Sequence, residues 1–432
     1  MDVPQPFSTL KKGATTMAKH SLLLVWVFIW FFSYVLIAQE AKVPLGSEAR
    51  NGKLVFESKD EAFKWWFDSR LQIDGAMYFE NKNAMSNGAT FRRLTFALKS
   101  VLWKDWQSEL DVDFAEAVST KSQTDLRDMW IKYTFPHFNL SLQAGNFKEP
   151  FGMERLNSSR LLTFLERSAV SNALPLGRRI GLSARYWTEY AQATAAIMGH
   201  EAGTRIDKGQ RDEGFSTNLR LSGAPINEHG QNLHIGLAGS YKIPDAVADL
   251  TPNTIEISAR TETYVFNPKF LHSGDITDVN YYNRYGGELM YINGPFYFQS
   301  EFMGTTVKRW FDKTSVNVRG AYATATWMIT GETRDYYVDE GEVGPVEAPK
   351  NSWGALELAA RYSMLDLNDA GAGVNGGKSN QIMLGVNYYP NVNIKLQFNY
   401  SVVDLDKYAT RKGSLVGNDD HSFIQMRIQA SM

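Results

Sequence analysis

The 432-residue chain contains no cysteine, which excludes disulfide frameworks, thiolate metal sites and cysteine nucleophiles. Neither sign of charge predominates, because 45 basic residues nearly balance 47 acidic ones and the net charge is −2. The hydrophobic content of 44% argues against both a disordered chain and a polytopic helical membrane protein. The seven histidines are scattered, and the chain lacks GxSxG, P-loop and dinucleotide motifs. We therefore expect no enzyme, no cofactor and no metal site.

One long apolar run occurs, SLLLVWVFIWFFSYVLIA at residues 21–38, and Lys11, Lys12 and Lys19 precede it. Basic residues followed by an apolar stretch and then polar residues are typical of a secretory signal. A single transmembrane helix is the alternative, but no basic stop-transfer cluster follows. The sequence predicts a cleaved leader over residues 1–39, with Met17 as an alternative start, and a periplasmic N-terminal segment over 40–62.

From residue 63 onward, apolar and polar side chains alternate with period two. Phe63–Glu80 is the clearest case, and an 18-residue alternation is a β-strand pattern that is long for a soluble protein. Sixteen such strands are expected, beginning near residues 63, 94, 106, 129, 138, 181, 191, 215, 232, 281, 295, 320, 354, 380, 391 and 422. A doubtful further stretch at 254–266 is assigned to a loop.

Short and long connections alternate along the chain, which is the asymmetry of an outer-membrane barrel with periplasmic turns and extracellular loops. A soluble β-sandwich is the alternative, but the charged face is too extensive for a sandwich core, and a closed barrel leaves no strand edge in lipid. The fold class predicted for 63–432 is therefore an all-β, antiparallel, up-and-down transmembrane barrel. One connection breaks the rule: the acidic link 331–352 stands where a short turn is due, and the pattern gives no reason for its length.

Residues 143–181 read QAGNFKEPFGMERLNSSRLLTFLERSAVSNALPLGRRIG and closely resemble the phosphate-selective porin O and P family. The stretches ESKDEAFKWWFDSRLQIDGA and WGALELAARYSMLDLNDAG are also similar to this family. The resemblance implies a homotrimeric porin with about 16 strands in the outer membrane of a Gram-negative bacterium. It also implies that the third loop folds into the lumen and forms the constriction.

The segment 148–185 carries seven Lys or Arg and three Asp or Glu residues. Guanidinium groups suit phosphate because they stay charged and offer paired donors, although a solvated loop with internal ion pairs is the alternative. By resemblance, Lys148 and the pair Arg92–Arg93 lie at the constriction with Asp128 as an acidic partner. Arg92 has the outward parity of its strand, so it can reach the lumen only if the strand bends there. Further candidate anion-binding residues are Arg155, Arg160, Arg167, Arg178, Arg179, Arg185 and Arg220.

These features favour passive diffusion of small anionic solutes, phosphate or similar, through the barrel. Glu109, Asp111 and Asp113 place an inward acidic row on one strand, so a weakly selective general or oligosaccharide porin is an alternative. A non-conducting surface interaction barrel is a second alternative. The expected partners are small anions, outer-membrane lipid and two further copies of the chain, with no nucleic acid.

Overall fold

A computed structural model describes residues 45–50, 53–119, 124–202, 211–247, 253–265 and 268–432. The predicted leader, residues 1–39 with the alternative start Met17, lies outside these ranges. Within them, no helix combines the length and the apolar character that crossing a bilayer would require.

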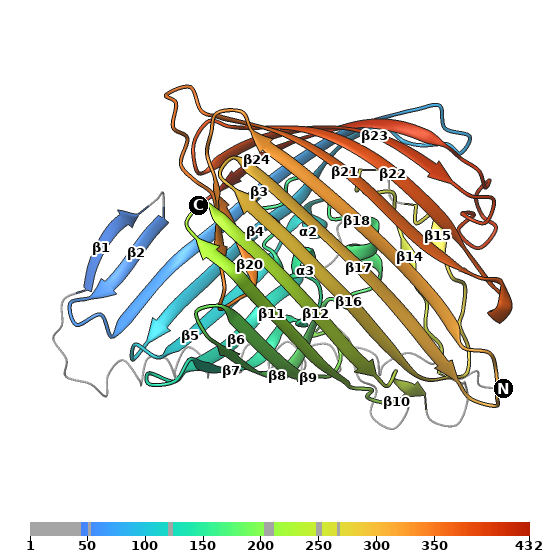
Figure 1. Cartoon of the computed structure of the whole chain (residues 1–432), viewed down its shortest axis with the longest axis horizontal. Helices are drawn as coiled ribbons and strands as arrows, with labels where there is room; N and C mark the ends of the chain where they lie inside the picture. The colour runs from blue at the N-terminus through green and yellow to red at the C-terminus, as the bar shows by residue number, and fades with distance from the viewer. Residues whose placement is uncertain (1–44, 51–52, 120–123, 203–210, 248–252, 266–267) are drawn as a thin grey trace, which may run out of the picture.

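The fold is a closed barrel of sixteen antiparallel strands, all sixteen of which the sequence pattern predicted (Figure 1). In chain order they are β3 (Phe63–Phe79), β4 (Gly88–Leu102), β5 (Trp106–Asp113), β6 (Asp125–Thr134), β7 (Leu140–Lys148), β8 (Arg178–Trp187), β9 (Ala191–Met198), β11 (Ser216–Glu228), β12 (Gln231–Lys242), β16 (Val279–Asn293), β17 (Phe296–Arg309), β18 (Val316–Met328), β21 (Ala355–Asp369), β22 (Val374–Tyr389), β23 (Ile394–Leu405) and β24 (His421–Ser431). Each strand pairs with its neighbours along the chain.

The barrel closes where β24 pairs with β3, from Ser422 opposite Phe79 to Ser431 opposite Arg70. The N-terminal end of β3 extends beyond β24. Its edge there pairs with β2 (Lys53–Ser58), the second strand of a hairpin with β1 (Leu45–Arg50). This hairpin lies within the segment that the sequence assigned to the periplasm. It extends the sheet at the end of the barrel that carries the short turns (Figure 1).

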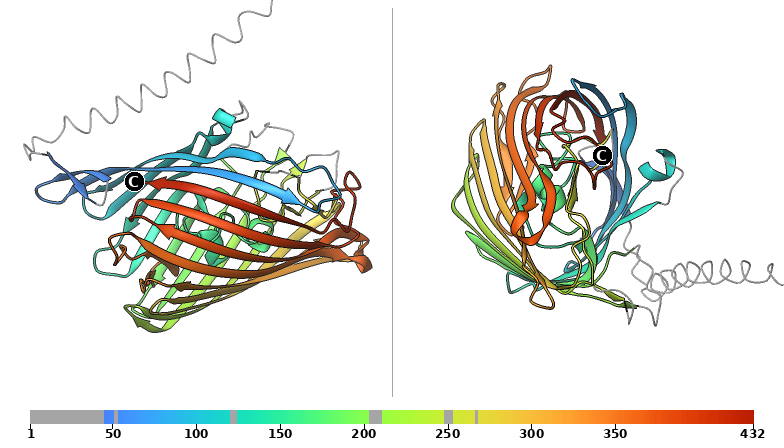
Figure 2. Two further views of the ribbon diagram at one scale, coloured as in Figure 1. Left: turned by 90° about the horizontal axis from the view of Figure 1, so that it is seen from above. Right: turned by 90° about the vertical axis from the view of Figure 1, so that its right-hand side faces the viewer.

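The remaining elements are short and lie in the connections. They are α2 (Ala115–Ser119), α3 (Met153–Leu156), α4 (Ala169–Ala173), β10 (Arg211–Asp212), β13 (Ala246–Val247), β14 (Ser258–Ala259), β15 (Leu271–His272), β19 (Arg334–Tyr337), β20 (Glu342–Val346) and η1 (Ala370–Ala372). The end-on view in Figure 2 shows connecting segments inside the ring of strands. Residues 254–265, the described part of the predicted loop 254–266, contain the two-residue strand β14 and a single β-bridge at Ile255.

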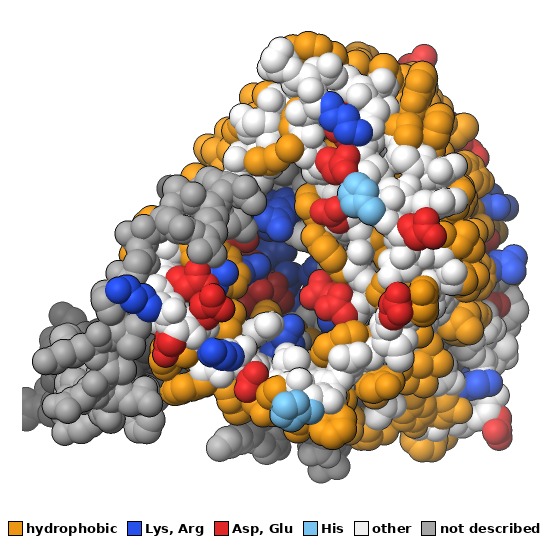
Figure 3. Space-filling view, turned by 60° about the vertical axis from the view of Figure 1, so that its left-hand side comes forward, with side chains coloured by type: hydrophobic (Ala, Val, Ile, Leu, Met, Phe, Trp, Pro, Cys, Tyr) orange, Lys and Arg blue, Asp and Glu red, His pale blue; other side chains and the backbone are white. Residues whose placement is uncertain are grey.

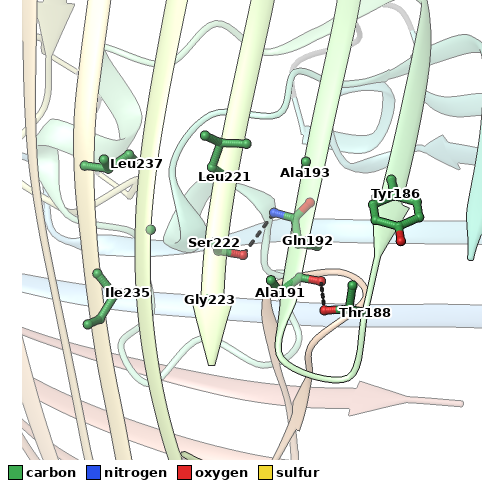
Figure 4. A pocket seen from close by; sticks show the side chains of 11 residues that line it. Tyr186, Thr188, Ala191, Gln192, Ala193, Leu221, Ser222, Gly223, Ile235 and Leu237 are labelled. Carbon is green, nitrogen blue, oxygen red and sulfur yellow. Dashed lines mark hydrogen bonds between the residues drawn. The ribbon is translucent and has the colours of Figure 1, made fainter. Parts of the chain in front are cut away.

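The two faces of the barrel wall differ in polarity, as period-two alternation requires. On β12, Ile235 and Leu237 are exposed on the outer face, whereas His234 and Ser240 are buried on the inner face. Small residues such as Ala193 leave a shallow apolar groove between the leucines of the outer face (Figure 4). The groove faces away from the lumen, so it is not part of a solute path.

We expect an arginine at Leu237, whose side chain is 65% exposed on the outer face near the middle of β12, to destabilise the lipid-embedded barrel by about 2–4 kcal/mol. The matched control is Gln143→Arg on the inner face of β7, where water can solvate the new charge. The measurement is the urea midpoint of protein refolded into lipid vesicles. Equal losses in the two variants would contradict the assignment of the faces.

Candidate functional site in the lumen

The connection between β7 and β8, residues 149–177, runs inside the barrel and reaches the opposite wall (Figure 2). Its peptide groups cannot all reach water there, and the wall supplies donors for its carbonyl oxygens. The amide of Asn387 donates to the carbonyl of Thr163 (2.8 Å), and Arg427 donates to that of Leu165 (2.6 Å). Donors to other carbonyls of the segment come from Gln72, Arg361, Lys395, Gln397 and Gln429.

Three carboxylates of this segment form buried ion pairs with wall arginines. Glu149 binds Arg284 through both oxygens, and Glu154 accepts from Arg361 (2.6 Å). Glu166 pairs with Arg427 (3.2 Å) and, through both oxygens, with Arg92 (2.6 and 3.0 Å). Burial alone would raise the pKa of Glu166, but Arg92, with Arg93 and Arg427, holds that pKa far below its ordinary range. Glu166 therefore stays ionised and anchors the segment.

Arg92 reaches the lumen because β4 contains a β-bulge at this residue. Gln72 of β3 lies opposite Arg93, and the next residue, Ile73, lies opposite Phe91, so Arg92 is the extra residue. The strand bends as the parity argument required, and both arginines face inward. Arg92 is engaged with Glu166, and Arg93 donates to the amide oxygen of Gln72 (2.6 Å).

A second bulge places Arg127 and Asp128 of β6 together on the inner face. Both lie opposite the single residue Asp111 of β5, and Arg127 donates to Asp113 (3.0 Å). Asp128 accepts from Arg178 (2.5 Å), the first residue of β8. The β5–β8 wall therefore presents alternating acidic and basic groups. The sequence identified Asp128 and Arg178 but missed Arg127, because nothing in the pattern marks the bulge.

The other predicted residues divide by what they contact. Lys148 donates to the carbonyls of Leu156 and Asn157. The remaining contacts are those of Arg167 with the carbonyls of Glu154 and Asn157, Arg160 with Asp68 (3.7 Å), Arg179 with Glu201 (3.6 Å), Arg185 with Glu340 (3.9 Å) and Arg220 with Glu288 (2.7 Å). Most of these guanidinium groups already hold protein structure together.

Arg155 differs from the others because no ion pair or hydrogen bond engages its guanidinium within the described ranges. Burial, together with Arg178, lowers the pKa of Arg155 to about 10, so the side chain remains a cation at neutral pH. Several neighbouring arginines also keep a buried Nε that donates to no group of the described chain, namely Arg70, Arg93, Arg178 and Arg179. Unpaired guanidinium N–H groups therefore occur on the β3–β8 side, and also at Arg284 and Arg334 on the opposite side of the lumen.

Carboxylate oxygens of Glu109, Asp111 and Asp128 lie within 4.8 Å of one another, as a cation site would require. All three carboxylates are already paired with cations, Glu109 with Lys99 (3.3 Å), Asp111 with Arg127 (3.5 Å) and Asp128 with Arg178 (2.5 Å). A metal ion would have to displace these cations. The cluster therefore fits a pore wall of mixed charge better than a metal centre.

The long acidic link 331–352 also folds into the lumen, which explains its length. Its strands β19 and β20 form a hairpin, and Tyr336 contacts His234 of the wall (2.6 Å). The amide of Val343 donates to Asn157 of the inward segment (3.3 Å). A turn that fills space inside the barrel needs more residues than one that only reverses the chain.

The matching family model and a curated relative point to the same family. Residues 67–431 match the family described as "Phosphate-selective porin O and P". Porin O of Pseudomonas aeruginosa is 25% identical, over 88% of this chain and 90% of that protein. Among solved structures, an anion-selective porin from Comamonas acidovorans has a TM-score of 0.53 at 12% identity, covering 86% of this chain and all of that one. OmpT of Vibrio cholerae has a TM-score of 0.52 at 10% identity, covering 87% and 99%.

We expect Glu166→Gln to release the inward segment from the wall, because it leaves Arg92 as a buried charge without its counter-charge and removes one of the two carboxylate partners of Arg427. Breaking a buried pair in this way costs about 3–5 kcal/mol. Hydrogen exchange of the amides in 149–177 measures the release. The control is Asp312→Asn in an exposed loop, which should leave exchange unchanged. Unaltered protection in Glu166→Gln would contradict the anchoring role.

Proposed function

The chain belongs to the phosphate-selective porin O and P family, and we propose that it conducts small phosphate-type anions, selected where the inward segment 149–177 narrows the lumen. At the coarser level the protein is an outer-membrane anion porin of a Gram-negative bacterium. We further propose that it assembles as a homotrimer and is exported by a leader over residues 1–39. The finer assignment of solute and constriction is argued below from the side chains of the lumen.

The observation that carries the proposal is Arg155, a cation of the inward segment that no group of the described chain engages. Arg155 is a cation with no partner in the described chain, and the buried Nε atoms of Arg70 and Arg178 donate to nothing there. Guanidinium groups bind phosphate oxygens in planar, charge-assisted pairs. A dehydrating anion that passes these residues exchanges water for fixed donors, which lowers the barrier to entry.

The two halves of the lumen then have different roles. The wall from β16 to β24 holds the inward segment through Arg284, Arg361 and Arg427, each paired with a carboxylate. The wall from β3 to β8 also contacts the segment, through Gln72, Arg92 and Lys148, and it carries most of the cations that we assign to the path. We assign Lys148, Arg155, Arg160, Arg178, Arg179 and Arg185 to the path. Arg92, Arg93, Arg167 and Arg220 are assigned to positioning through their protein acceptors. Lys148 and Arg178 also have protein acceptors, and we keep them on the path because they form one group of charges with Asp128.

Weak selectivity is the second candidate, and the acidic cluster of Glu109, Asp111 and Asp128 favours it. Carboxylates and guanidinium groups that face one pore produce a transverse field, which orders water and admits ions of both signs. Figure 3 looks toward the turn end and shows acidic and basic side chains together around the hollow of that face. Ion selectivity measured across a bilayer separates this candidate from the first.

We expect the purified protein in a planar bilayer under a tenfold potassium chloride gradient to give a reversal potential whose sign shows that chloride permeates more readily than potassium. Fixed positive charge on the path concentrates chloride and excludes potassium. Millimolar phosphate should then reduce the chloride current, because phosphate binds the guanidinium donors more tightly. A potential of cation sign would refute the anion assignment, whereas an unblocked current would refute only the preference for phosphate.

Arg155→Gln should lower the ratio of chloride to potassium permeability roughly two- to fivefold, since it deletes a charge at the path without breaking a described contact. Lys148→Glu should lower the ratio further or invert it. The control is Arg309→Gln, whose side chain donates to carbonyls at the loop end of the barrel. If Arg155→Gln behaved like this control, Arg155 would not line the path.

A further inference from the structure

The tip of the inward hairpin, residues 335–342, is held against the inner wall beside the proposed anion path. Arg220 of β11 donates to the carbonyls of Glu340 (3.0 Å) and Gly341 (2.7 Å). Gly341 has a φ of 62°, and a Cβ atom there would lie 2.7 Å from Ser222 Oγ and 2.9 Å from Arg220 Nη1. Such close approach requires glycine, so the tip has a fixed position on the wall.

The base of the hairpin is fixed as well. Arg334 pairs with Glu357 of β21, and Val343 packs with Met153 of the inward segment in one apolar cluster. The hairpin thus connects the wall at β11 and β21 with segment 149–177. Its tip cannot leave the lumen without breaking these contacts.

The tip carries a concentration of negative charge. Asp339, Glu340 and Glu342 fall within four residues, and Glu340 keeps 43% of its side chain exposed. Its carboxylate lies 3.9 Å from the guanidinium of Arg185 on β8. Burial and the neighbouring Glu340 raise the pKa of Glu342 to about 7, against the opposing effect of Lys148. Glu340 therefore faces Arg185, one of the cations that we assigned to the path.

We propose that Glu340, with Glu342 beside it on the same hairpin, acts as a tethered counter-charge that competes with passing anions for Arg185 and so sets the ion selectivity of the pore. The inference rests on the proposed anion path. A free anion must displace a carboxylate that is covalently held at the site, which lowers occupancy and speeds release. The two glutamates are thus specificity-determining residues.

Ionic strength and pH should both control this competition. Salt screens an attraction across several ångströms, so the effect is large at 0.01–0.1 M salt and small at 1 M, where the Debye length is about 3 Å. Since the pKa of Glu342 is raised to about 7, protonation begins as the pH falls through neutrality and removes one competing charge. The charged groups that act on Glu342 are Glu340 of its own hairpin, Lys148 of β7, Arg185 of β8 and Arg220 of β11.

The test compares the unmodified protein with the double variant Glu340→Gln, Glu342→Gln in planar bilayers under a tenfold gradient from 0.01 to 0.1 M potassium chloride. We expect the variant to shift toward anions, with the permeability ratio rising roughly two- to fivefold. Repeated between 0.1 and 1 M, the same comparison should show a smaller shift. Lowering the pH from 8 to 6 should move the unmodified protein toward the variant, and Glu342→Gln alone should reduce that pH response.

Glu189→Gln, in the exposed turn between β8 and β9 at the same end of the barrel, is the matched control and should not shift the potential. Heat-modifiable migration on a denaturing gel checks that each variant forms a closed barrel. An unchanged potential in a folded double variant overturns the inference while leaving the anion assignment intact. A cation-directed potential in the unmodified protein refutes the anion assignment, and the shift between the two proteins still decides whether the hairpin charges face the path.

Discussion

Every peptide group in this protein that lies away from water needs a hydrogen-bond partner within the chain, and this requirement shapes both the barrel and its contents. On the lipid side it is met by closing sixteen strands into a ring at the seam of β3 and β24. Inside the ring the irregular segment 149–177 has no ladder to join. Side chains of the wall replace the ladder, as when Gln397 donates to the carbonyl of Thr163.

This arrangement divides the charged residues of the lumen by task. Arg284, Arg361 and Arg427 have buried carboxylate partners and hold the inward segment 149–177 in position. On the proposed path, Arg155 of the segment itself has no partner in the described chain and so retains capacity for a solute. The proposed conducting space then has one rigid boundary, the wall that holds the segment, and one boundary that meets the solute. Changes on the second boundary can alter selectivity without dismantling the first.

The sequence predicted the strands well because alternation is a local property that each strand carries by itself. It could not reveal the bulge at Arg92, since an extra residue is defined only against the register of the neighbouring strand. The partners of Glu166 were equally hidden, because Arg427 lies 261 residues away. Hairpin 331–352 left a visible signal in its length and acidity. That signal could be interpreted only once its contacts with Arg220 and Asn157 were known.

The ion pair between Asp74 and Arg427 joins strands 353 residues apart at the seam of the barrel. Closure therefore depends on pairing between the first and last strands of the barrel, and folding with such remote pairings is slow. Until β24 docks, the outward leucines and aromatic residues belong to an open sheet with two free edges, a state prone to aggregation. Assembly thus requires that the whole chain be kept unfolded and shielded until its last strand is available.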